Sequence, residues 1–465
     1  MNNPTIAAVA TPPGRGGIGI IKLSGKDALS IAESIFVKRL TKNQSNQKHY
    51  FEPHKLYLGD IVNKEKGKNI DEVLLSVMKA PHSYTKEDVV EINAHSGHIA
   101  LNEILKLVLQ KGAQLAQPGE FTKRAFINGR IDLTQAEAVI DIINAKTEKS
   151  LEIASAQISG NLKERISLIH TSLLEVLAEI NADIDFPDEV GDHLNKDLIK
   201  NKINNEAVNP LVELLENYEK GHVYREGVRL VVAGKPNVGK SSLMNRMANK
   251  ERAIVTALPG TTRDVIEEMI NINGIPAIIS DTAGLHDSTD PVEVLGIKKA
   301  YEHINVSDII LFMVDASRKL TKEDFKIQKD FDYKEMILVI NKIDLVKSDF
   351  EIKIPDEWKK LQKAKISALY DRGIDDLKKM IENTYTDDFG QNIQDKIIPN
   401  LRHKIIIEKC LKLISKTKQG LKDETPFELI AIDIKDAIDS LDDIIGISVK
   451  EELLDRIFSR FCIGK

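Results

Sequence analysis

The chain has 465 residues, 29% of them charged, and a formal net charge of −6 at pH 7. This length predicts about three domains, and the acidic balance excludes a protein that is basic throughout, although a local basic patch is compatible with it. The chain has only two cysteines, Cys410 and Cys462, which excludes a disulfide framework. Its start shows no secretory signal pattern, and no apolar run reaches about 18 residues. We therefore expect a cytoplasmic protein without a membrane span.

The first region, residues 5–119, mixes short strand-like runs with glycine and proline turns. The runs at 19–23 and 72–78 are typical of strands because aliphatic residues cluster there between turn signals. We therefore expect an α/β domain over residues 1–119.

Two helical blocks follow, one over residues 134–184 and one from 397 to the end. Their apolar residues recur at spacings of three, four or multiples of these, which predicts helices with one buried face. In the first block this face consists of Ile140, Ile143, Leu151, Ala154, Ile158, Leu162, Ile166, Ile169, Leu173, Leu177 and Ile180. The polar segment 191–209 is interpreted as a connecting loop or a frayed helix. We expect one helical domain in two parts, at 120–224 and 386–465, with another domain inserted between them.

The inserted region, residues 225–385, alternates strand-like and helix-like segments. Strands are predicted at 228–233, 265–272, 277–280, 309–314, 336–340 and 365–366. This alternation is typical of a mostly parallel, doubly wound sheet. The predicted fold class is therefore multidomain, with an N-terminal α/β domain, a helical domain and an inserted Ras-like P-loop domain.

A phosphate-binding motif opens the inserted region. Residues 234–241 read GKPNVGKS, which matches G-x-x-x-x-G-K-[ST] in full, between a predicted strand and a predicted helix. In such a loop the backbone N–H groups wrap the phosphates, Lys240 reaches the β- and γ-phosphates, and the hydroxyl of Ser241 binds Mg²⁺. The predicted nucleotide contacts here are Asn237, Val238, Gly239, Lys240, Ser241 and Ser242.

Two shorter signals follow the phosphate-binding motif. Residues 281–284 read DTAG after an apolar strand, so Asp281 is placed to hold Mg²⁺ through water and the Gly284 N–H to sense the γ-phosphate. Thr262 lies between the motifs, where a switch threonine contacts Mg²⁺. The predicted contacts in this part are Thr256, Ala257, Leu258, Pro259, Gly260, Thr261, Thr262, Asp281, Thr282, Ala283 and Gly284.

The base is predicted to be guanine. Residues 341–344 read NKID, and Asp344 can accept hydrogen bonds from guanine N1–H and N2–H₂, whereas adenine has neither donor. Residues 367–369, which read SAL, add a backbone contact to guanine O6. The predicted base contacts are Asn341, Lys342, Ile343, Asp344, Ser367, Ala368 and Leu369. Four motifs in this order predict a GTP site with Mg²⁺.

Hydrolysis requires a group that the usual position does not supply. The residue after DTAG is Leu285, which cannot orient the attacking water as glutamine does in Ras-like switches. Asn237 and the carbonyl-rich segment 256–261 could together ligate a monovalent cation where an arginine finger would lie. Glu293 is a candidate for positioning the water, although an exposed glutamate at a helix start is the simpler interpretation.

Several further segments resemble one protein family. They are residues 5–20 (TIAAVATPPGRGGIGI), 118–126 (PGEFTKRAF), 132–138 (DLTQAEA), 184–189 (IDFPDE) and 461–465 (FCIGK). Together with the nucleotide motifs, they make essentially the whole chain resemble the tRNA-modification GTPases of the MnmE (TrmE) family.

The resemblance implies a folate-binding N-terminal domain, a helical domain and a potassium-activated GTPase domain whose copies meet across a homodimer. The folate would be a tetrahydrofolate derivative, 5-formyl or 5,10-methylene. It also implies an FAD-dependent partner, MnmG (GidA), in a heterotetramer. Together they would form the 5-carboxymethylaminomethyl group on the wobble uridine of certain tRNAs, using a folate one-carbon unit.

The resemblance further assigns roles to single residues. These are Asn237, Thr256, Leu258 and Thr261 for potassium, Ser241 and Thr262 for Mg²⁺, Glu293 and Lys240 for catalysis, and Lys22, Glu91, Arg130 and Lys465 for folate. The family commonly has arginine where Lys22 stands and lysine where Arg130 stands, which keeps the charge but changes the hydrogen-bond geometry.

The end of the chain carries two further expectations. Cys462 is either a buried small hydrophobe, as free cysteines often are, or a catalytic thiolate near the folate pocket, where the family places it. Apolar residues from Leu453 to Phe461 can anchor a final helix, and Gly464 then allows a turn that aims Lys465 into the N-terminal domain of the same or another chain.

Two alternative functions stay open at this point. One is a regulatory GTPase of the ribosome-assembly type, which would need a basic RNA-binding appendage. The other is a self-sufficient folate-dependent transferase in which GTP only regulates.

Overall fold

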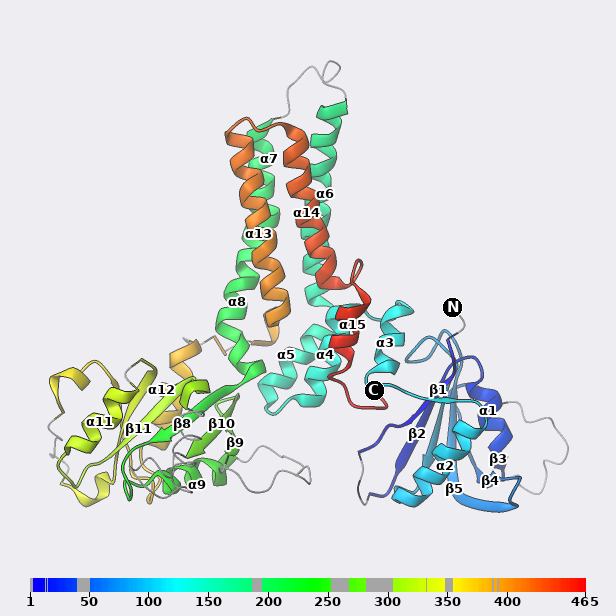
Figure 1. Ribbon diagram of the computed structural model, residues 1–465, viewed down its shortest axis with the longest axis horizontal. Helices are drawn as coiled ribbons and strands as arrows, with labels where there is room; N and C mark the ends of the chain where they lie inside the picture. The colour runs from blue at the N-terminus through cyan, green and yellow to red at the C-terminus, as the bar shows by residue number, and fades with distance from the viewer. Residues whose placement is uncertain are drawn as a thin grey trace. The chain divides into compact units, whose positions relative to one another are not determined.

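The computed structural model describes residues 3–39 apart from 13 and 15, then 51–185, 195–251, 267–281, 304–331, 333–347, 354–386, 389–390 and 393–465. The chain divides into two compact units, Met1–Ile140 with Asp439–Lys465, and Asp141–Ile438 (Figure 1). Outside the described residues lie the predicted site residues Thr256, Ala257, Leu258, Pro259, Gly260, Thr261, Thr262, Thr282, Ala283, Gly284 and Glu293, and the side chain of Asp281. Among the described helices, none is long and apolar enough to span a membrane.

The first unit contains a seven-stranded sheet in the order β3-β4-β5-β6-β2-β1-β7, antiparallel except for the β1–β7 pair. The strands are β1 (Ile6–Val9), β2 (Gly19–Ser24), β3 (Phe36–Lys38), β4 (Leu56–Asn63), β5 (Lys68–Met78), β6 (Val89–Ala94) and β7 (Gln114–Leu115). Helices α1 (Ala28–Ile35) and α2 (His98–Gln110) pack on one face and bury its apolar residues. The predicted α/β character of this region is confirmed.

The opposite face of this sheet carries two kinds of residue. Side chains alternate between faces along a strand, so Lys22 and its register partner Glu91 lie on the face away from α1 and α2. Further along the same face, Leu58 and Leu74 are paired in register and exposed, with Leu56 nearby. The open face is therefore polar at one end and apolar at the other.

The two ends of the chain meet within the first unit. Helix α3 (Glu120–Ile127) packs against α15 (Glu451–Phe458), and Phe458 and Phe461 are buried there. The Phe121 N–H donates to the backbone oxygen of Lys465 at 3.2 Å. Gly464 has φ +91°, and a Cβ there would lie 2.7 Å from the Val9 oxygen, so only glycine fits the turn. The predicted final helix, and the predicted approach of the tail to the N-terminal domain, are confirmed within one chain.

The helical part of the second unit contains long antiparallel helices (Figure 1). They are α5 (Glu148–Ile158), α6 (Asn161–Asp185), α7 (Lys196–Ile203), the π-helical turn η1 (Asn204–Val208), α8 (Asn209–Glu226) and α13 (Leu401–Lys422). Two more helices, α4 (Leu133–Asn144) and α14 (Phe427–Ile445), extend across the border between the units in the sequence.

Two sequence interpretations need correction here. The single helical face predicted for 134–184 is divided among three helices, because Thr147 caps α5 and Gly160, at φ +94°, follows its end. Three residues predicted on that face are consequently exposed, namely Ile143, Leu151 and Ile158. Within 191–209, residues 196–208 form the helical run α7–η1, because Asn195 caps its start and Ile199 and Ile203 are buried; the loop interpretation is wrong there.

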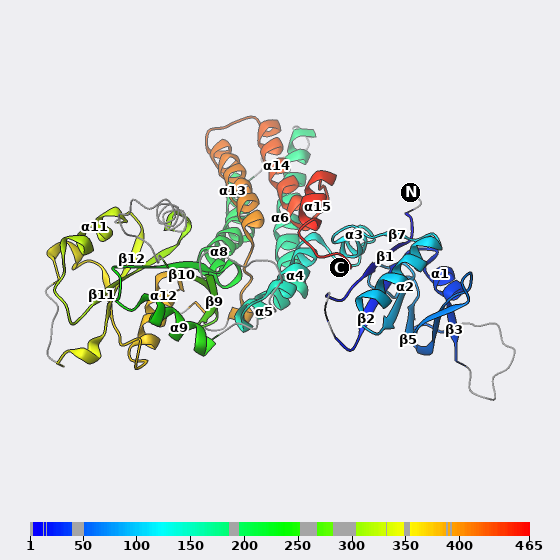
Figure 2. The same ribbon diagram turned by 60° about the horizontal axis from the view of Figure 1, so that its bottom comes forward.

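The inserted sheet has the order β13-β12-β11-β8-β10-β9 and is parallel except for β9. Its strands are β8 (Val228–Ala233), β9 (Glu267–Ile272), β10 (Ile275–Asp281), β11 (Ile309–Asp315), β12 (Glu335–Asn341) and β13 (Gln362–Lys365). The helices are α9 (Lys240–Glu251), α11 (Lys322–Asp330), α12 (Ile374–Thr386) and the short turns η2 (Ile343–Leu345), η3 (Asp356–Trp358) and η4 (Ile393–Asp395). Separate apolar cores fill its two faces, and the two views agree on helices flanking the sheet (Figures 1 and 2). The doubly wound fold is confirmed.

Candidate functional site

The phosphate-binding loop joins β8 to α9 at the carboxyl edge of the inserted sheet, where open α/β sheets bind their ligands. The Nζ atom of Lys240 donates to the carbonyl oxygens of Gly234 at 2.9 Å and Lys235 at 3.1 Å, so the amine lies within the loop. Gly239 has φ +104°, and a Cβ there would lie 2.3 Å from Nδ2 of Asn341. The loop therefore needs glycine at this position because a bracing side chain lies against it.

The hydroxyls predicted to serve Mg²⁺ follow the loop. Ser241 and Ser242 are exposed in the first turn of α9, whereas Val238 is buried beneath the loop. Asp281 is the last residue of β10 and is paired in register with Val232, just before the phosphate loop. The two Mg²⁺ motifs are therefore on neighbouring strands at one edge of the sheet.

Asn341 and Lys342 brace the phosphate loop. Asn341 Nδ2 donates to the Val238 oxygen at 2.8 Å, and its Oδ1 accepts the Ala368 N–H at 3.0 Å. Lys342 Nζ donates to the Asn237 oxygen at 2.6 Å. This dipeptide ties together the phosphate loop and the 367–369 loop, which are far apart in the sequence.

The turn at residues 367–372 lies beside the residue predicted to read guanine. Ser367 Oγ donates to Oδ1 of Asp344 at 2.5 Å, which fixes the orientation of that carboxylate. The Ala368 N–H is bound to Asn341, whereas the Leu369 N–H has no acceptor within the described part of the chain and is therefore available as a donor. Ile343 directly precedes Asp344 in the short η2 turn.

A second group of predicted residues comes together in the first unit. Burial lowers the pKa of Lys22; Glu91 raises it in part, and Lys465 and Arg130 lower it further. Glu91, Arg130 and Lys465, which the resemblance assigned to folate together with Lys22, are therefore all within electrostatic reach of Lys22. Three of these four residues are cations, so the cluster is suited to an anionic ligand.

Two aromatic rings line this cluster. Lys22 Nζ lies 4.6 Å from the ring centroid of Tyr84 and 5.2 Å from that of Phe121. Arg130 Cζ lies 4.7 Å from the Tyr84 centroid, and its Nη1 donates to the Tyr84 backbone oxygen at 3.3 Å. Burial raises the pKa of Tyr84, whose hydroxyl is 2.9 Å from Oγ1 of Thr122. The two cations therefore pack against aromatic rings, of which Tyr84 is half-buried and Phe121 is fully buried.

Two family models match the chain, "GTP-binding protein TrmE N-terminus" over residues 5–130 and "MnmE helical domain" over residues 133–462. Proteins named tRNA modification GTPase MnmE match its full length. That of Carboxydothermus hydrogenoformans is 45% identical over 100% of both chains, and that of Clostridioides difficile is 44% identical over 99% of both. This chain belongs to the MnmE family of tRNA modification GTPases.

Membership in the MnmE family makes the chain a GTPase, as the nucleotide motifs predict. Solved structures similar to it include a variant of Aquifex aeolicus Era bound to GDP·AlF4⁻, 31% identical over 40% of this chain and 67% of that one, with a TM-score of 0.30. Another is the G domain of T. maritima FeoB, 22% identical over 34% of this chain and 97% of that one, with a TM-score of 0.26. The full-length match to MnmE proteins counts against both alternative functions considered from the sequence.

Sequence reasoning missed several residues that support the nucleotide site of this MnmE family member. Arg246 on α9 donates through Nε to the Ala368 oxygen at 3.3 Å and through Nη2 to the Leu369 oxygen at 2.8 Å, which orients the turn beside the base. Asp315 accepts from Lys342 Nζ at 2.8 Å. Burial alone would raise the pKa of Asp315, but hydrogen bonds from Lys342 and Ser317 outweigh burial and hold it below its usual range.

The two cysteines of this MnmE family member differ in exposure. Cys462 is exposed, so the interpretation of a buried small hydrophobe is wrong; its neighbours Phe461 and Gly464 occupy the buried positions instead. Cys410 is buried, and burial raises the pKa of its thiol to about 12. At neutral pH Cys410 is therefore an unreactive thiol, whereas Cys462 is accessible.

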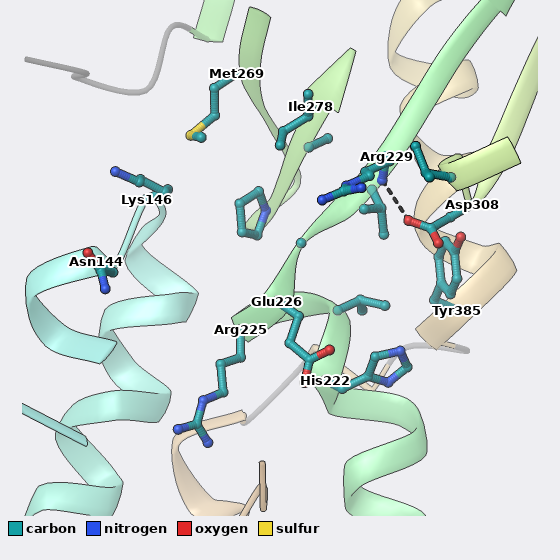
Figure 3. Close-up of a pocket in the computed structure, with 16 residues that line it drawn as sticks. Asn144, Lys146, His222, Arg225, Glu226, Arg229, Met269, Ile278, Asp308 and Tyr385 are labelled. Atoms are coloured by element: carbon teal, nitrogen blue, oxygen red, sulfur yellow. Dashed lines mark hydrogen bonds between the residues drawn. The ribbon is translucent and has the colours of Figure 1, made fainter. Parts of the chain in front are cut away.

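Two cavities lie elsewhere. One, of 610 Å³, lies at the amino edge of the inserted sheet, where the Arg229 N–H donates to Oδ2 of Asp308 at 2.7 Å near Tyr385 (Figure 3). The other, of 920 Å³, is lined by residues of α3 and α15. Neither of these two cavities is lined by a predicted site residue.

Proposed function

We propose that this chain is a potassium-activated GTPase that works with the FAD-dependent protein MnmG on the wobble uridine of certain tRNAs. The product is the 5-carboxymethylaminomethyl group, and a tetrahydrofolate derivative supplies the one-carbon unit. The observation that supports the proposal is that this member of the MnmE family contains two separate groups of residues, the nucleotide loops and the Lys22 cluster. We assign residues 1–119 to folate binding, 225–385 to GTP, and 120–224 with 386–465 to the helical domain, and place the activity in the cytoplasm.

The nucleotide loops hold GTP and orient its phosphates. Lys240 contacts the β- and γ-phosphates, and Asp344 with the 367–369 loop selects guanine. Ser241, Thr262 and Asp281 hold Mg²⁺, which would neutralise phosphate charge. This assignment to Mg²⁺ is supported by Ser241 and Asp281, which lie at the same edge of the sheet. Glu293 positions the water, and its role stands on the family resemblance alone.

The Lys22 cluster binds the folate. The ammonium and guanidinium groups of Lys22, Arg130 and Lys465 attract the carboxylates of the glutamate tail. The half-buried ring of Tyr84, which lies against Lys22 and Arg130, is the aromatic surface for the pterin or benzoyl ring. Glu91, in register with Lys22, is the acceptor for pterin N–H groups. Cys462 is the candidate nucleophile beside them, and its exposure supports that role.

The functional assembly is a homodimer before MnmG binds. Leu56, Leu58 and Leu74 are 65%, 47% and 41% exposed on one sheet face. A second copy of this chain is the occupant we propose for this apolar surface, since the family resemblance implies a dimer. The molar mass of the purified chain by light scattering tests the dimer directly, and a monomer at micromolar concentration would contradict it.

Potassium dependence should be visible in steady-state hydrolysis. Leu285 cannot orient water, so turnover at saturating GTP is expected to be at least about tenfold higher in K⁺ than in Na⁺ at matched ionic strength, given the ~10³–10⁵ that an arginine finger supplies elsewhere. Asn237→Ala is expected to abolish the difference, because its amide is the proposed side-chain ligand. Phosphate release in the two salts measures both.

The backbone at Asn237 requires a second variant as a control. Its φ is +63°, a conformation that strains alanine but suits glycine. Asn237→Gly should therefore also lose the potassium effect while keeping the loop unstrained. If Asn237→Gly retains the full K⁺ preference, the amide is not a potassium ligand.

Folate affinity should depend on the protonation of Lys22. Its lowered pKa means that it loses its charge at a lower pH than an ordinary lysine, whose value is 10.5. The charged form is present below the lowered pKa, so affinity should be full there and fall as the pH rises through it. Lys22→Arg stays charged over this range and should flatten the profile. Calorimetry of 5-formyl-tetrahydrofolate binding across pH measures this, and parallel profiles for both proteins would rule out the role of Lys22.

A further inference from the structure

Helix α13 has an unusual distribution of charge for a chain with a net charge of −6. Its cations are Arg402, Lys404, Lys409, Lys412, Lys416, Lys418 and Lys422, against a single acid, Glu408. In Figure 1 it runs along α7 and α8, with which it packs. It is therefore necessary to ask which anionic groups balance the positive charge of this helix.

The buried side of α13 is a regular seam. Buried residues alternate at spacings of four and three, as in a helix packed along one side of a bundle. They are His403, Ile407, Cys410, Ile414, Thr417 and Leu421. This pattern fixes which side of the helix is available to other molecules.

Cations on the flank of the seam have partners within the bundle. Lys404 Nζ lies 2.5 Å from Oε1 of Glu219 on α8, and Lys418 Nζ donates to Oδ1 of Asn204 in η1 at 2.5 Å. These bonds account for the flanking lysines as part of bundle packing. They leave nothing for an external partner to recognise there.

The side opposite the seam is different. Lys409, Lys412 and Lys416 follow one another at spacings of three and four and are all exposed. At about 1.5 Å rise per residue they form a line roughly 10 Å long. Within the described part of the chain, none of the three has an ion pair, and Glu408 is the only carboxylate of α13.

Two half-buried cations of the same bundle are paired with carboxylates. Arg165 on α6 pairs with Glu213, and Lys202 on α7 pairs with Glu175 and Glu179. The line on α13 is thus a local concentration of positive charge without carboxylate partners. A row of ammonium groups at this spacing complements a polyanion such as a nucleic-acid backbone, which gains affinity by counterion release.

We propose that Lys409, Lys412 and Lys416 bind the phosphate backbone of the tRNA. This rests on the proposed function, which makes tRNA the substrate. Lysines on one helix face carry no base-reading geometry, so the contact positions the tRNA and is independent of its sequence. The line lies on α13, for which the sequence predicted no ligand.

The test is tRNA binding by the full-length chain in which all three lysines are replaced by glutamine. The dissociation constant for unmodified tRNA should rise about tenfold or more, and the slope of log affinity against log salt should fall by about two to three, since each phosphate contact contributes about 0.7–0.9. Replacing the three lysines by arginine should retain both values. GTP turnover should be unchanged, because none of the three contacts the nucleotide loops.

A matched control removes the same charge elsewhere. Lys64, Lys66 and Lys68 are exposed in the β4–β5 hairpin, and their replacement by glutamine should leave the salt slope nearly unchanged. Equal weakening by both triple variants would show a net-charge effect and overturn the proposal. So would intact tRNA binding combined with lost MnmG binding, which would make the line a protein-docking surface. If the unaltered chain and MnmG together bind no tRNA, it is the proposed function that fails.

Discussion

Asp344→Asn is expected to change the nucleotide preference of the chain from GTP toward XTP. The carboxylate accepts two donors of guanine, and the amide instead presents a donor that complements the C2 carbonyl of xanthine. An unpaired polar contact in the base site costs a few kcal/mol, so GTP affinity should fall on the order of 100-fold or more. Competition binding with GTP and XTP measures the change.

Asp356→Asn provides the matched control for this prediction. Asp356 lies in the same domain, with its side chain 89% exposed and paired only with Lys359, so the same chemical change should leave both affinities as they are. Ser367 Oγ already donates to Oδ1 of Asp344, and the amide oxygen of asparagine can accept the same bond, so the local turn should persist. Unchanged discrimination between GTP and XTP in Asp344→Asn would contradict the base-reading role.

Deleting residues 462–465 is expected to abolish tRNA modification while leaving folding and GTP hydrolysis nearly intact. Of the deleted residues only Gly464 is buried, and the backbone bonds lost are those that Gly119 and Phe121 donate to the tail. Two hydrogen bonds contribute about 1–3 kcal/mol to stability. The Lys22 cluster, by contrast, loses one of its three cations, and the chain loses its accessible thiol. Thermal unfolding, folate calorimetry and mass spectrometry of tRNA measure the three effects.

Two full-length variants separate the parts of the tail. Lys465→Ala should weaken folate binding by about tenfold, as expected for a charge-assisted contact of 1.5–3 kcal/mol. Cys462→Ser keeps the charge and the turn, so it should bind folate normally and lose modification only if the thiol reacts. Normal modification by the truncated chain would show that the tail only packs against α3.

The phosphate-binding loop could be predicted from the sequence because its determinants are local. Gly239 is required by a positive φ, and Lys240 follows it at the helix start, so a short pattern contains both the conformation and the chemistry. Strand β13 was less predictable, because Gln362–Lys365 is a polar edge strand without an apolar run. The predicted run at 365–366 overlaps only its last residue.

The supporting residues could not be predicted because their partners are distant in the sequence. Arg246 contacts oxygens of a turn more than a hundred residues away, and Asp315 depends on Lys342 in the same way. Tyr84 and Phe121 look like ordinary core residues in a sequence, and only the fold brings their ring centroids to 4.6 and 5.2 Å from Lys22 Nζ. The resemblance identified the cationic residues of that cluster, but not the aromatic residues Tyr84 and Phe121 against which Lys22 packs.

The most direct test of the account is the wobble uridine of tRNA from a strain that lacks this chain. We expect that mass spectrometry finds no 5-carboxymethylaminomethyl group, that the unaltered chain restores it, and that Lys240→Ala and Lys22→Ala each fail to do so. The two variants disable separate groups of residues, so both must fail to restore the modification. A modified uridine in the null strain, or its full restoration by either variant, would contradict the claim that GTP hydrolysis and the folate cluster serve one tRNA modification.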